Sequence, residues 1–178
     1  SPMLVLAYLL IFVGLGFKLA LAPFHLWAPD VYQNAPTPVA GWVGSGSKIA
    51  AAALLIALLQ PVSDAPKLKE ALIPALAALA VLSMVVGNLG ALRQTNLKRL
   101  LAYSAIANAG YLLVGVVAFS AAGNASVIFY ILVYSLASLG AFGVVAVLTD
   151  TLGRDAEISD FNGCWTKTPG LAVAFLVF

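Results

Sequence analysis

The chain has 178 residues, of which 62% are hydrophobic and 9% are charged, and its mean hydropathy is +1.03. Soluble domains carry about 25% charged residues, so this composition excludes a soluble globular domain and indicates an integral membrane protein. The formal net charge of +2 is too small to indicate a nucleic acid partner, and the single cysteine, Cys164, excludes an internal disulfide or a cysteine-based metal cluster.

Repeated apolar runs predict an all-α, polytopic bundle of membrane helices, because a span needs about 20 apolar residues. The expected spans are approximately 3–22, 39–60, 71–92, 100–120, 125–148 and 169–178. These make five full spans and the start of a sixth, within one transmembrane unit over residues 1–178. Both ends of the sequence lie inside apolar runs, so we expect a fragment of a longer membrane subunit.

Four prolines interrupt the chain between the first two spans, at Pro23, Pro29, Pro36 and Pro38. Proline removes a helical hydrogen bond and clashes with the preceding turn. The stretch therefore predicts either a membrane helix that breaks and resumes as a short second piece, or an interfacial loop. Broken helices occur in membranes only where protein or a wet cavity satisfies the freed backbone groups.

Lys48 lies about ten residues into the second span, within the small-residue run GSGSKIA. At 1.5 Å per residue this places it roughly 15 Å from the helix start, near the bilayer midplane. A charge there costs about 2.5–3.5 kcal/mol on insertion scales, and a lysine side chain is too short to reach the headgroups. Burial disfavours the ammonium form, so we interpret Lys48 as an amine that loads and releases a proton.

Lys18 and His25 are the other candidate proton-transfer residues. Lys18 either extends to the interface or lies deeper, just before the break, and His25 in the break is either a structural polar residue or a proton relay. All seven acidic residues lie in loops or at span ends: Asp30, Asp64, Glu70, Asp150, Asp155, Glu157 and Asp160. A buried ammonium requires a counter-ion, so either these lysines are neutral or their partner carboxylate lies on a helix outside this sequence.

The fourth and fifth expected spans carry polar side chains, including Asn108, Tyr130 and Tyr134. Such groups predict interhelical hydrogen bonds, with the lining of a channel as the alternative. No metal-ligand spacing is present, so we expect no metal site.

Alternate loops should lie on opposite sides of the membrane, and one set of alternate loops contains more basic residues than the other. The Pro-rich break, the loop at 93–99 and the polar connection at 149–168 should share one side, and that connection has room for a short surface helix. The other side carries Lys67 and Lys69 in the loop PVSDAPKLKE. The positive-inside rule places the first side in the cytoplasm.

Four segments together resemble a known family: FKLALAPFHLWAPDVYQNAPTPV, GSGSKIA, NLGALRQTNLKRLLAYSAIANAGYLLVG and LGAFGVV. They resemble the antiporter-like membrane subunits of respiratory complex I, and most closely the subunit N family of NADH-quinone oxidoreductase, which is similar to mitochondrial subunit 2. The resemblance covers essentially the whole chain. The related subunits L and M typically have histidine where this chain has Lys48, which favours subunit N.

The resemblance implies a portion of a larger fold of two inverted five-helix repeats, with this chain holding helices seven to eleven and the start of twelve. It implies that Lys18 and Lys48 belong to a hydrophilic axis that moves protons, while the family's glutamate on helix five and lysine on helix twelve are absent from this sequence. The implied reaction is electron transfer from NADH to quinone, coupled to proton translocation in a bacterial inner membrane. NADH, FMN, iron–sulfur clusters and quinone would be bound by partner subunits rather than by this chain.

Two other functions stay open at this point. The first is a subunit of a multisubunit cation/proton antiporter or of a membrane-bound hydrogenase, which share this fold. The second is a structural membrane subunit without a proton path.

Overall fold

The computed structural model describes residues 2–178, apart from the side chains at positions 2, 4, 5 and 167. Its elements are α1 (Pro2–Leu19), α2 (Trp27–Asn34), α3 (Thr37–Gly44), α4 (Gly46–Ser63), α5 (Pro66–Ala91), α6 (Leu97–Val117), α7 (Ala121–Leu152), η1 (Ile158–Phe161), α8 (Cys164–Lys167) and α9 (Pro169–Val177). Extended pairing in the described residues is limited to one isolated bridge between Asn96 and Glu157. The predicted all-α bundle is therefore confirmed.

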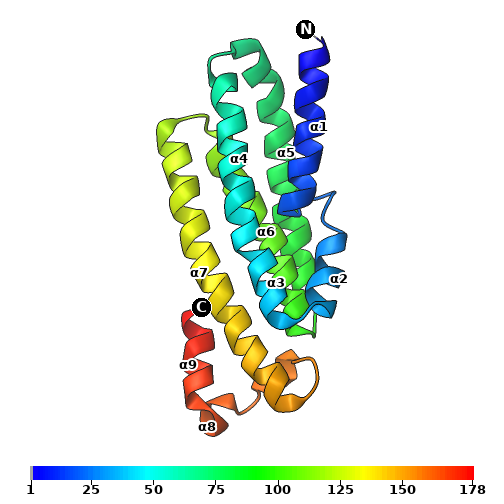
Figure 1. Cartoon of the computed structure of the whole chain (residues 1–178), viewed down its shortest axis with the longest axis vertical. Coiled ribbons are helices and arrows are strands. Elements are labelled where there is room, and N and C mark those ends of the chain that lie inside the picture. Colours follow the sequence, from blue (N-terminus) through cyan, green and yellow to red (C-terminus); the bar gives the residue numbers. More distant parts are fainter. Residues whose placement is uncertain (1) are drawn as a thin grey trace.

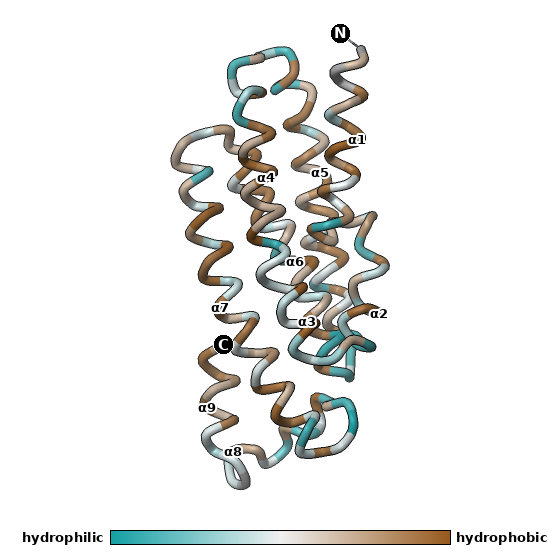
Figure 2. Tube along the Cα trace, in the orientation of Figure 1, coloured by the Kyte–Doolittle hydropathy of each residue, from teal (hydrophilic) through white to brown (hydrophobic). Residues whose placement is uncertain are grey.

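The long helices run side by side and alternate in direction (Figure 1). Four stretches are long and apolar enough to cross a membrane, namely Thr37–Ser63, Pro66–Ala91, Leu97–Val117 and Ala121–Leu152, and α1 adds a further apolar helix. Hydrophilic residues gather mainly at the two ends of the bundle (Figure 2). The bundle is therefore a membrane domain with few polar residues in its interior.

The Pro-rich stretch is a helix break, as the first of the two readings predicted. The chain leaves α1 at Leu19 and resumes as α2, which lies beyond the end of α1 along the bundle (Figure 1). The groups freed by the break find partners: Leu21 N donates to the Gly16 carbonyl at 2.8 Å, and Trp27 Nε1 donates to the Phe17 carbonyl at 3.0 Å. The buried Ala22 N–H donates to Ser83 Oγ of α5 at 2.9 Å. These protein groups thus provide the hydrogen bonds that water cannot supply inside a bilayer.

The expected loop over residues 61–70 is wrong in extent, because only Asp64 and Ala65 separate α4 from α5. Pro66 stands in the first turn of α5, where its missing N–H has no helical partner to lose. Pro61 and Pro74 lie inside α4 and α5 rather than at their ends. A membrane helix tolerates proline when neighbouring groups satisfy the freed carbonyl.

The fifth span is longer than the sequence indicated, with α7 running from Ala121 to Leu152. The Ser120 hydroxyl caps its start by accepting from Gly123 N at 3.0 Å, and Gly153 ends it in the left-handed conformation at φ 65°. The expected surface helix in the following connection is represented by two four-residue turns, η1 and α8.

The α2–α3 joint of the Pro-rich stretch, the turn before α6 and the connection after α7 lie at one end of the bundle, while the break between α1 and α2 lies farther along it (Figure 1). Arg99 at the start of α6 binds Asp30 of α2 at 2.5 Å. Leu97 N donates to the Ala156 carbonyl at 3.1 Å, which joins the same turn to the connection after α7. This part of the topology is confirmed, while the assignment of that side to the cytoplasm stays a prediction.

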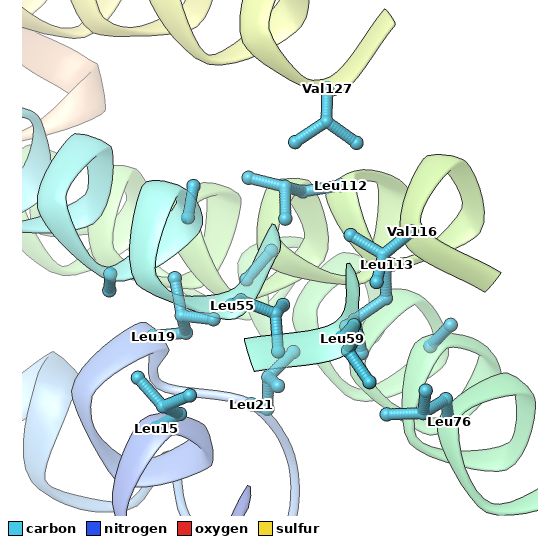
Figure 3. Packing of buried hydrophobic residues seen from close by; sticks show 14 of the residues in the cluster. Leu15, Leu19, Leu21, Leu55, Leu59, Leu76, Leu112, Leu113, Val116 and Val127 are labelled. Carbon is cyan, nitrogen blue, oxygen red and sulfur yellow. The ribbon is translucent and has the colours of Figure 1, made fainter. Parts of the chain in front are cut away.

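Leucine and valine side chains from α1, α4, α5, α6 and α7 fill the half of the bundle away from this end (Figure 3). A second cluster, nearer the polar end, is built from small residues around two aromatic rings, Tyr32 and Phe142. Tyr134 packs against both clusters. The layer at Tyr134 therefore separates a leucine-rich core from an alanine-rich one.

Helices α5 and α6 approach each other most closely at glycines. A Cβ atom on Gly87 would lie 2.8 Å from the Cα of Ala107, and one on Gly110 would lie 2.7 Å from the Ala80 carbonyl oxygen. Small residues at such contacts allow membrane helices to pack backbone against backbone. The close contact between α5 and α6 fixes the position of α6, one face of which belongs to the site around Lys48.

We expect Ser83→Ala to destabilise the helix break. The Ala22 N–H would lose its acceptor in a buried position, which costs about 1–3 kcal/mol. The measurement is the thermal unfolding midpoint of the detergent-purified full-length subunit. Ser126→Ala is the matched control, because the exposed Ser126 hydroxyl bonds only to a carbonyl of its own helix. Equal midpoints for the two variants would contradict this role of Ser83.

We expect Gly87→Ala to lower the same midpoint and Gly143→Ala to leave it unchanged or raise it. Alanine favours a helix over glycine by about 1 kcal/mol, but at Gly87 the added methyl meets the α6 backbone, and such overpacking costs about 1–3 kcal/mol. A Cβ on Gly143 meets nothing within 4 Å. A rise in the midpoint for both variants would show that the α5–α6 contact is not close.

Candidate functional site around Lys48

Lys48 lies just after an interruption in the second spanning helix. Ser45 separates α3 from α4 and has φ −119° and ψ −77°. Its N–H donates to the Trp42 carbonyl at 3.3 Å, while its hydroxyl donates to the Gly41 carbonyl at 2.7 Å. The continuous helix that the sequence indicated is therefore wrong at this point. The signal was the run Gly44-Ser45-Gly46, whose glycines are poor helix formers.

The Lys48 side chain points into the bundle and is only 3% exposed. Its Nζ donates to the Ala105 carbonyl of α6 at 2.5 Å. The same nitrogen lies 5.6 Å from the centroid of the Tyr134 ring of α7, within the range of a cation–π contact. Among the described residues, the ion pairs are formed by Lys98, Arg99 and Arg154, so Lys48 has no carboxylate partner there. The predicted burial of Lys48 is confirmed.

Polar side chains of α6 and α7 continue from Lys48. Tyr134 lines a cavity of about 250 Å³ together with Ser104, Asn108 and Ser138. The Asn108 amide donates to the Ser104 carbonyl at 2.8 Å, and its oxygen accepts a hydrogen bond from Tyr130 of α7. The predicted interhelical hydrogen bonding is confirmed, and the same residues also line a cavity.

A second interhelical bond joins α5 to α6, where Asn88 Nδ2 donates to Tyr111 Oη at 3.2 Å. On α7, Ser135 is 3% exposed and its hydroxyl has no hydrogen-bond partner within the described part of the chain. Buried polar groups of this kind are commonly satisfied by internal water.

Lys18 differs from Lys48 in its environment. Leu15 and Leu19 face the core and are buried, whereas Lys18 is exposed on the outer face of α1, one residue before the helix ends. Lys18 was expected either to extend to the interface or to lie deeper, just before the break. The structure places it just before the break but exposed, so that of the two lysines only Lys48 is buried. Leu15 and Leu19 take the positions of α1 that contact the core, and Lys18 lies outside that face. The two lysines do not share one site.

His25 lies in the break between α1 and α2 and is half-buried. Its Nδ1 is buried without a hydrogen-bond partner among the residues described. Its carbonyl accepts from Ala28 N at 2.9 Å, which starts α2. The structure thus places His25 at the break, apart from the Lys48 contacts, and the relay role stays a prediction.

One ion pair that involves a buried lysine was not predicted. Lys98, expected in a loop, is 5% exposed, and its Nζ lies 2.7 Å from Asp155 Oδ1 and 3.4 Å from the Ala35 carbonyl. It joins the start of α6 to the α2–α3 joint and to the connection after α7. Sequence gives little signal for such a pair, since its members are 57 positions apart. Nearby, Arg154 binds Asp160 at 2.6 Å and lowers the pKa of that carboxyl.

Within the described residues, no group of three or more histidine, cysteine, aspartate or glutamate side chains is arranged to hold a metal ion. In the described part of the chain, the polar side chains near Lys48 are its own amine together with hydroxyls and amides of α6 and α7. These groups can transfer protons and hold water.

Apolar helices of spanning length, two helix interruptions, and a buried lysine beside one of them define a polytopic membrane protein with broken helices. The family model described as "NADH:quinone oxidoreductase/Mrp antiporter, TM" matches residues 1–178. The chain belongs to this family. It is an integral membrane protein, and its bacterial relatives assign it to the inner membrane.

Individual relatives carry complex I names. NADH-quinone oxidoreductase subunit N 1 of Roseiflexus castenholzii is 45% identical over 99% of this chain and 35% of its own length. Subunit N 2 of Acidobacterium capsulatum is 48% identical over 100% of this chain and 37% of its own. The chain therefore spans about a third of the length of these relatives.

Solved structures agree with this assignment. A chain of respiratory complex I from Thermus thermophilus, determined with bound aureothin, has a TM-score of 0.78 and 42% identity, covering 99% of this chain and 38% of that one. A chain of the membrane-bound sulfane sulfur reductase, an archaeal respiratory membrane complex, has a TM-score of 0.74 and 28% identity, with coverages of 92% and 33%.

We expect Lys98→Met to loosen the connection after α7. The variant removes the ammonium that holds Asp155, and the segment around residues 154–163 should become more accessible. Limited proteolysis of the full-length subunit in detergent should show faster cleavage there. Lys67→Met, which changes an exposed lysine at the other end of the bundle, should cleave like the unmodified chain. Equal cleavage rates in both variants would contradict the role of the Lys98–Asp155 pair.

Proposed function

We propose that this chain is part of a proton-translocating membrane subunit of NADH-quinone oxidoreductase, of the subunit N type. In this proposal electron transfer from NADH to quinone drives proton movement through the membrane domain, and Lys48 carries the proton in this part of it. The observation that carries the proposal is the burial of Lys48 beside a helix interruption, with a carbonyl and an aromatic ring as its neighbours.

The environment of Lys48 suits a charge-sensitive proton carrier. An ammonium has three N–H groups to satisfy, and the described residues supply one carbonyl and one ring face. A unit charge about 10 Å away, at an effective dielectric constant of about 20, changes the free energy of protonation by about 1.7 kcal/mol. That is more than a tenfold change in proton binding. A charge that moves nearby would therefore load or unload Lys48.

Lys18 would supply such a charge at the break. It is placed on the outer face of α1, where a charge inside a membrane requires a partner, and its partner would lie on another helix of the full-length subunit. His25, whose Nδ1 has no partner among the described residues, is the candidate relay at the same break.

The redox chemistry of the proposed complex would be carried by other subunits. NADH, FMN, the iron–sulfur clusters and quinone are expected there, and this chain would contribute the proton step within the lipid bilayer. Its partners would be other membrane subunits of the complex, with no nucleic acid.

The alternative is a subunit of a cation/proton antiporter or a membrane-bound hydrogenase. The family model spans quinone oxidoreductases and Mrp antiporters, and the sulfane sulfur reductase chain has a similar fold. The higher identity to subunit N sequences, 45% and 48%, favours the quinone oxidoreductase. Copurification distinguishes the two, because either a quinone-reducing arm or antiporter and hydrogenase subunits should accompany the full-length protein.

We expect Lys48→Ala to reduce proton pumping about tenfold or more, since proton transfer by a positioned side chain typically contributes at least that much. The measurement uses the assembled complex in proteoliposomes, driven by NADH and quinone, with electron transfer recorded in parallel. Lys67→Ala, at an exposed site, is the control for loss of a lysine. Wild-type pumping and electron transfer in Lys48→Ala would overturn the proposal and favour a structural role for this chain.

A further inference from the structure

A groove lies between α1 and α5, which stand next to each other toward the end of the bundle where α1 begins (Figure 1). Its volume is about 280 Å³. The residues that line it are all apolar: Leu9, Phe12 and Val13 of α1, Phe24 of the break, and a row on α5 from Leu72 to Leu82. Within a membrane such a groove suits an apolar ligand.

The groove has a buried floor and an open rim. Leu72 and Leu76 of α5 are 4% and 3% exposed, whereas Leu9 and Val13 of α1 are nearly half exposed. Helix α1 packs mainly on α4, which leaves space on its α5 side. Small side chains at positions 75 and 78 of α5 add to this space. The groove can therefore be entered from the side, where lipid surrounds the bundle.

The break after α1 closes the inner end of the groove. The Ala22 N–H donates to Ser83 Oγ of α5 at 2.9 Å, one residue beyond the last α5 position in the groove. The Phe24 ring packs back onto α1, since a Cβ on Gly16 would lie 2.9 Å from its Cδ2. The chain thus crosses from α1 to α5 at this level, and the groove ends there.

The length of the groove fits one leaflet of a bilayer. Leu72 and Leu82 are ten residues apart, or roughly 15 Å along the helix. The hydrocarbon core of a bilayer is about 30 Å thick, so one leaflet contributes about half of that. A helix that crosses the membrane would need the whole thickness and would meet the break. A single acyl chain matches the groove in both length and chemistry.

Two lysines flank the groove face at its outer end. Leu68, one turn before Leu72, continues this face, and Lys67 and Lys69 project on its two sides. Lys67 is exposed, and Lys69 Nζ lies 5.4 Å from the centroid of the Phe119 ring. Glu70 projects from the opposite side of α5. The helix dipole is also positive at the start of α5, so this end of the groove attracts an anion.

We propose that the α1–α5 groove binds one acyl chain of an anionic phospholipid, whose phosphate lies against Lys67 and Lys69. The lipid belongs to the leaflet at the end of the bundle opposite the 92–96 turn. It fills the space that the break leaves between α1 and α5. The site is separate from Lys48 and needs no proton transfer, so either one can fail while the other stands.

Photolabelling measures this binding directly. The assembled complex with the full-length subunit is placed in phosphatidylcholine nanodiscs that contain a trace of phosphatidylglycerol with a diazirine in its acyl chain. A parallel sample contains phosphatidylcholine with the same labelled chain. After illumination, labelled peptides are identified by mass spectrometry. We expect phosphatidylglycerol to label residues 72–82 about fivefold or more above phosphatidylcholine, because each lysine near an anionic headgroup contributes about this factor.

Two results of this experiment would overturn the site. Equal labelling of residues 72–82 by the two lipids would exclude selection by the lysines. No labelling there by either lipid, while other helices of the complex are labelled, would show that a protein segment covers the groove.

Variants of the full-length subunit test the two parts of the site separately. We expect Ala75→Trp, which fills the groove, to remove most of the labelling, and Ala53→Trp, at an exposed position of α4, to leave it unchanged. The double variant Lys67→Gln and Lys69→Gln should abolish the preference for phosphatidylglycerol, while Glu70→Gln should retain it. Unchanged labelling in Ala75→Trp, or an unchanged preference in the double variant, would contradict the proposal.

Discussion

The absence of water inside a bilayer constrains this structure more than any other factor, because every backbone N–H and carbonyl released from a helix must find a partner within the protein. Besides the prolines inside α4 and α5, the described chain releases such groups where its spans are interrupted, after Leu19 and at Ser45. At the first point, carbonyls of α1 accept from Leu21 and the Trp27 indole, and Ser83 reaches across from α5 to the Ala22 N–H. At the second, the Ser45 hydroxyl bonds within its own turn. Irregular backbone beside Lys48 is possible only because these bonds exist.

The interior of the bundle has two parts that differ in their side chains. Leucine and valine fill one half, whereas alanine, glycine and two aromatic rings allow close helix contacts in the other. Lys48, Tyr134 and the amides and hydroxyls of α6 and α7 are grouped at the boundary between them. An amine at such a boundary is desolvated by the core on one side and has polar neighbours on the other.

Composition and apolar run lengths were sufficient to predict the membrane bundle, and the prolines predicted the break after α1, because both are local properties. The burial of Lys48 also agrees with its place about ten residues after Pro38 within the second span. The lengths of α4, α5 and α7 could not be predicted, because proline and polar residues occur both inside helices and at helix ends. Capping and packing decide at which of these residues a helix ends. Contacts between segments far apart in the sequence could not be predicted. Examples are Ser83 with Ala22, Lys98 with Asp155, and Lys48 with the Ala105 carbonyl. Nor could periodicity alone tell which face of α1 Lys18 occupies.

The Lys98–Asp155 pair has a mechanical consequence for the molecule. Lys98 also bonds to the Ala35 carbonyl, and the backbone beside it pairs with Ala156 and Ile158. The joint between α2 and α3, the first turn of α6 and the connection after α7 are therefore bonded to one another at one end of the bundle. None of these three segments, which lie far apart in the sequence, can shift away from the others without breaking bonds made by Lys98 or by the backbone beside it.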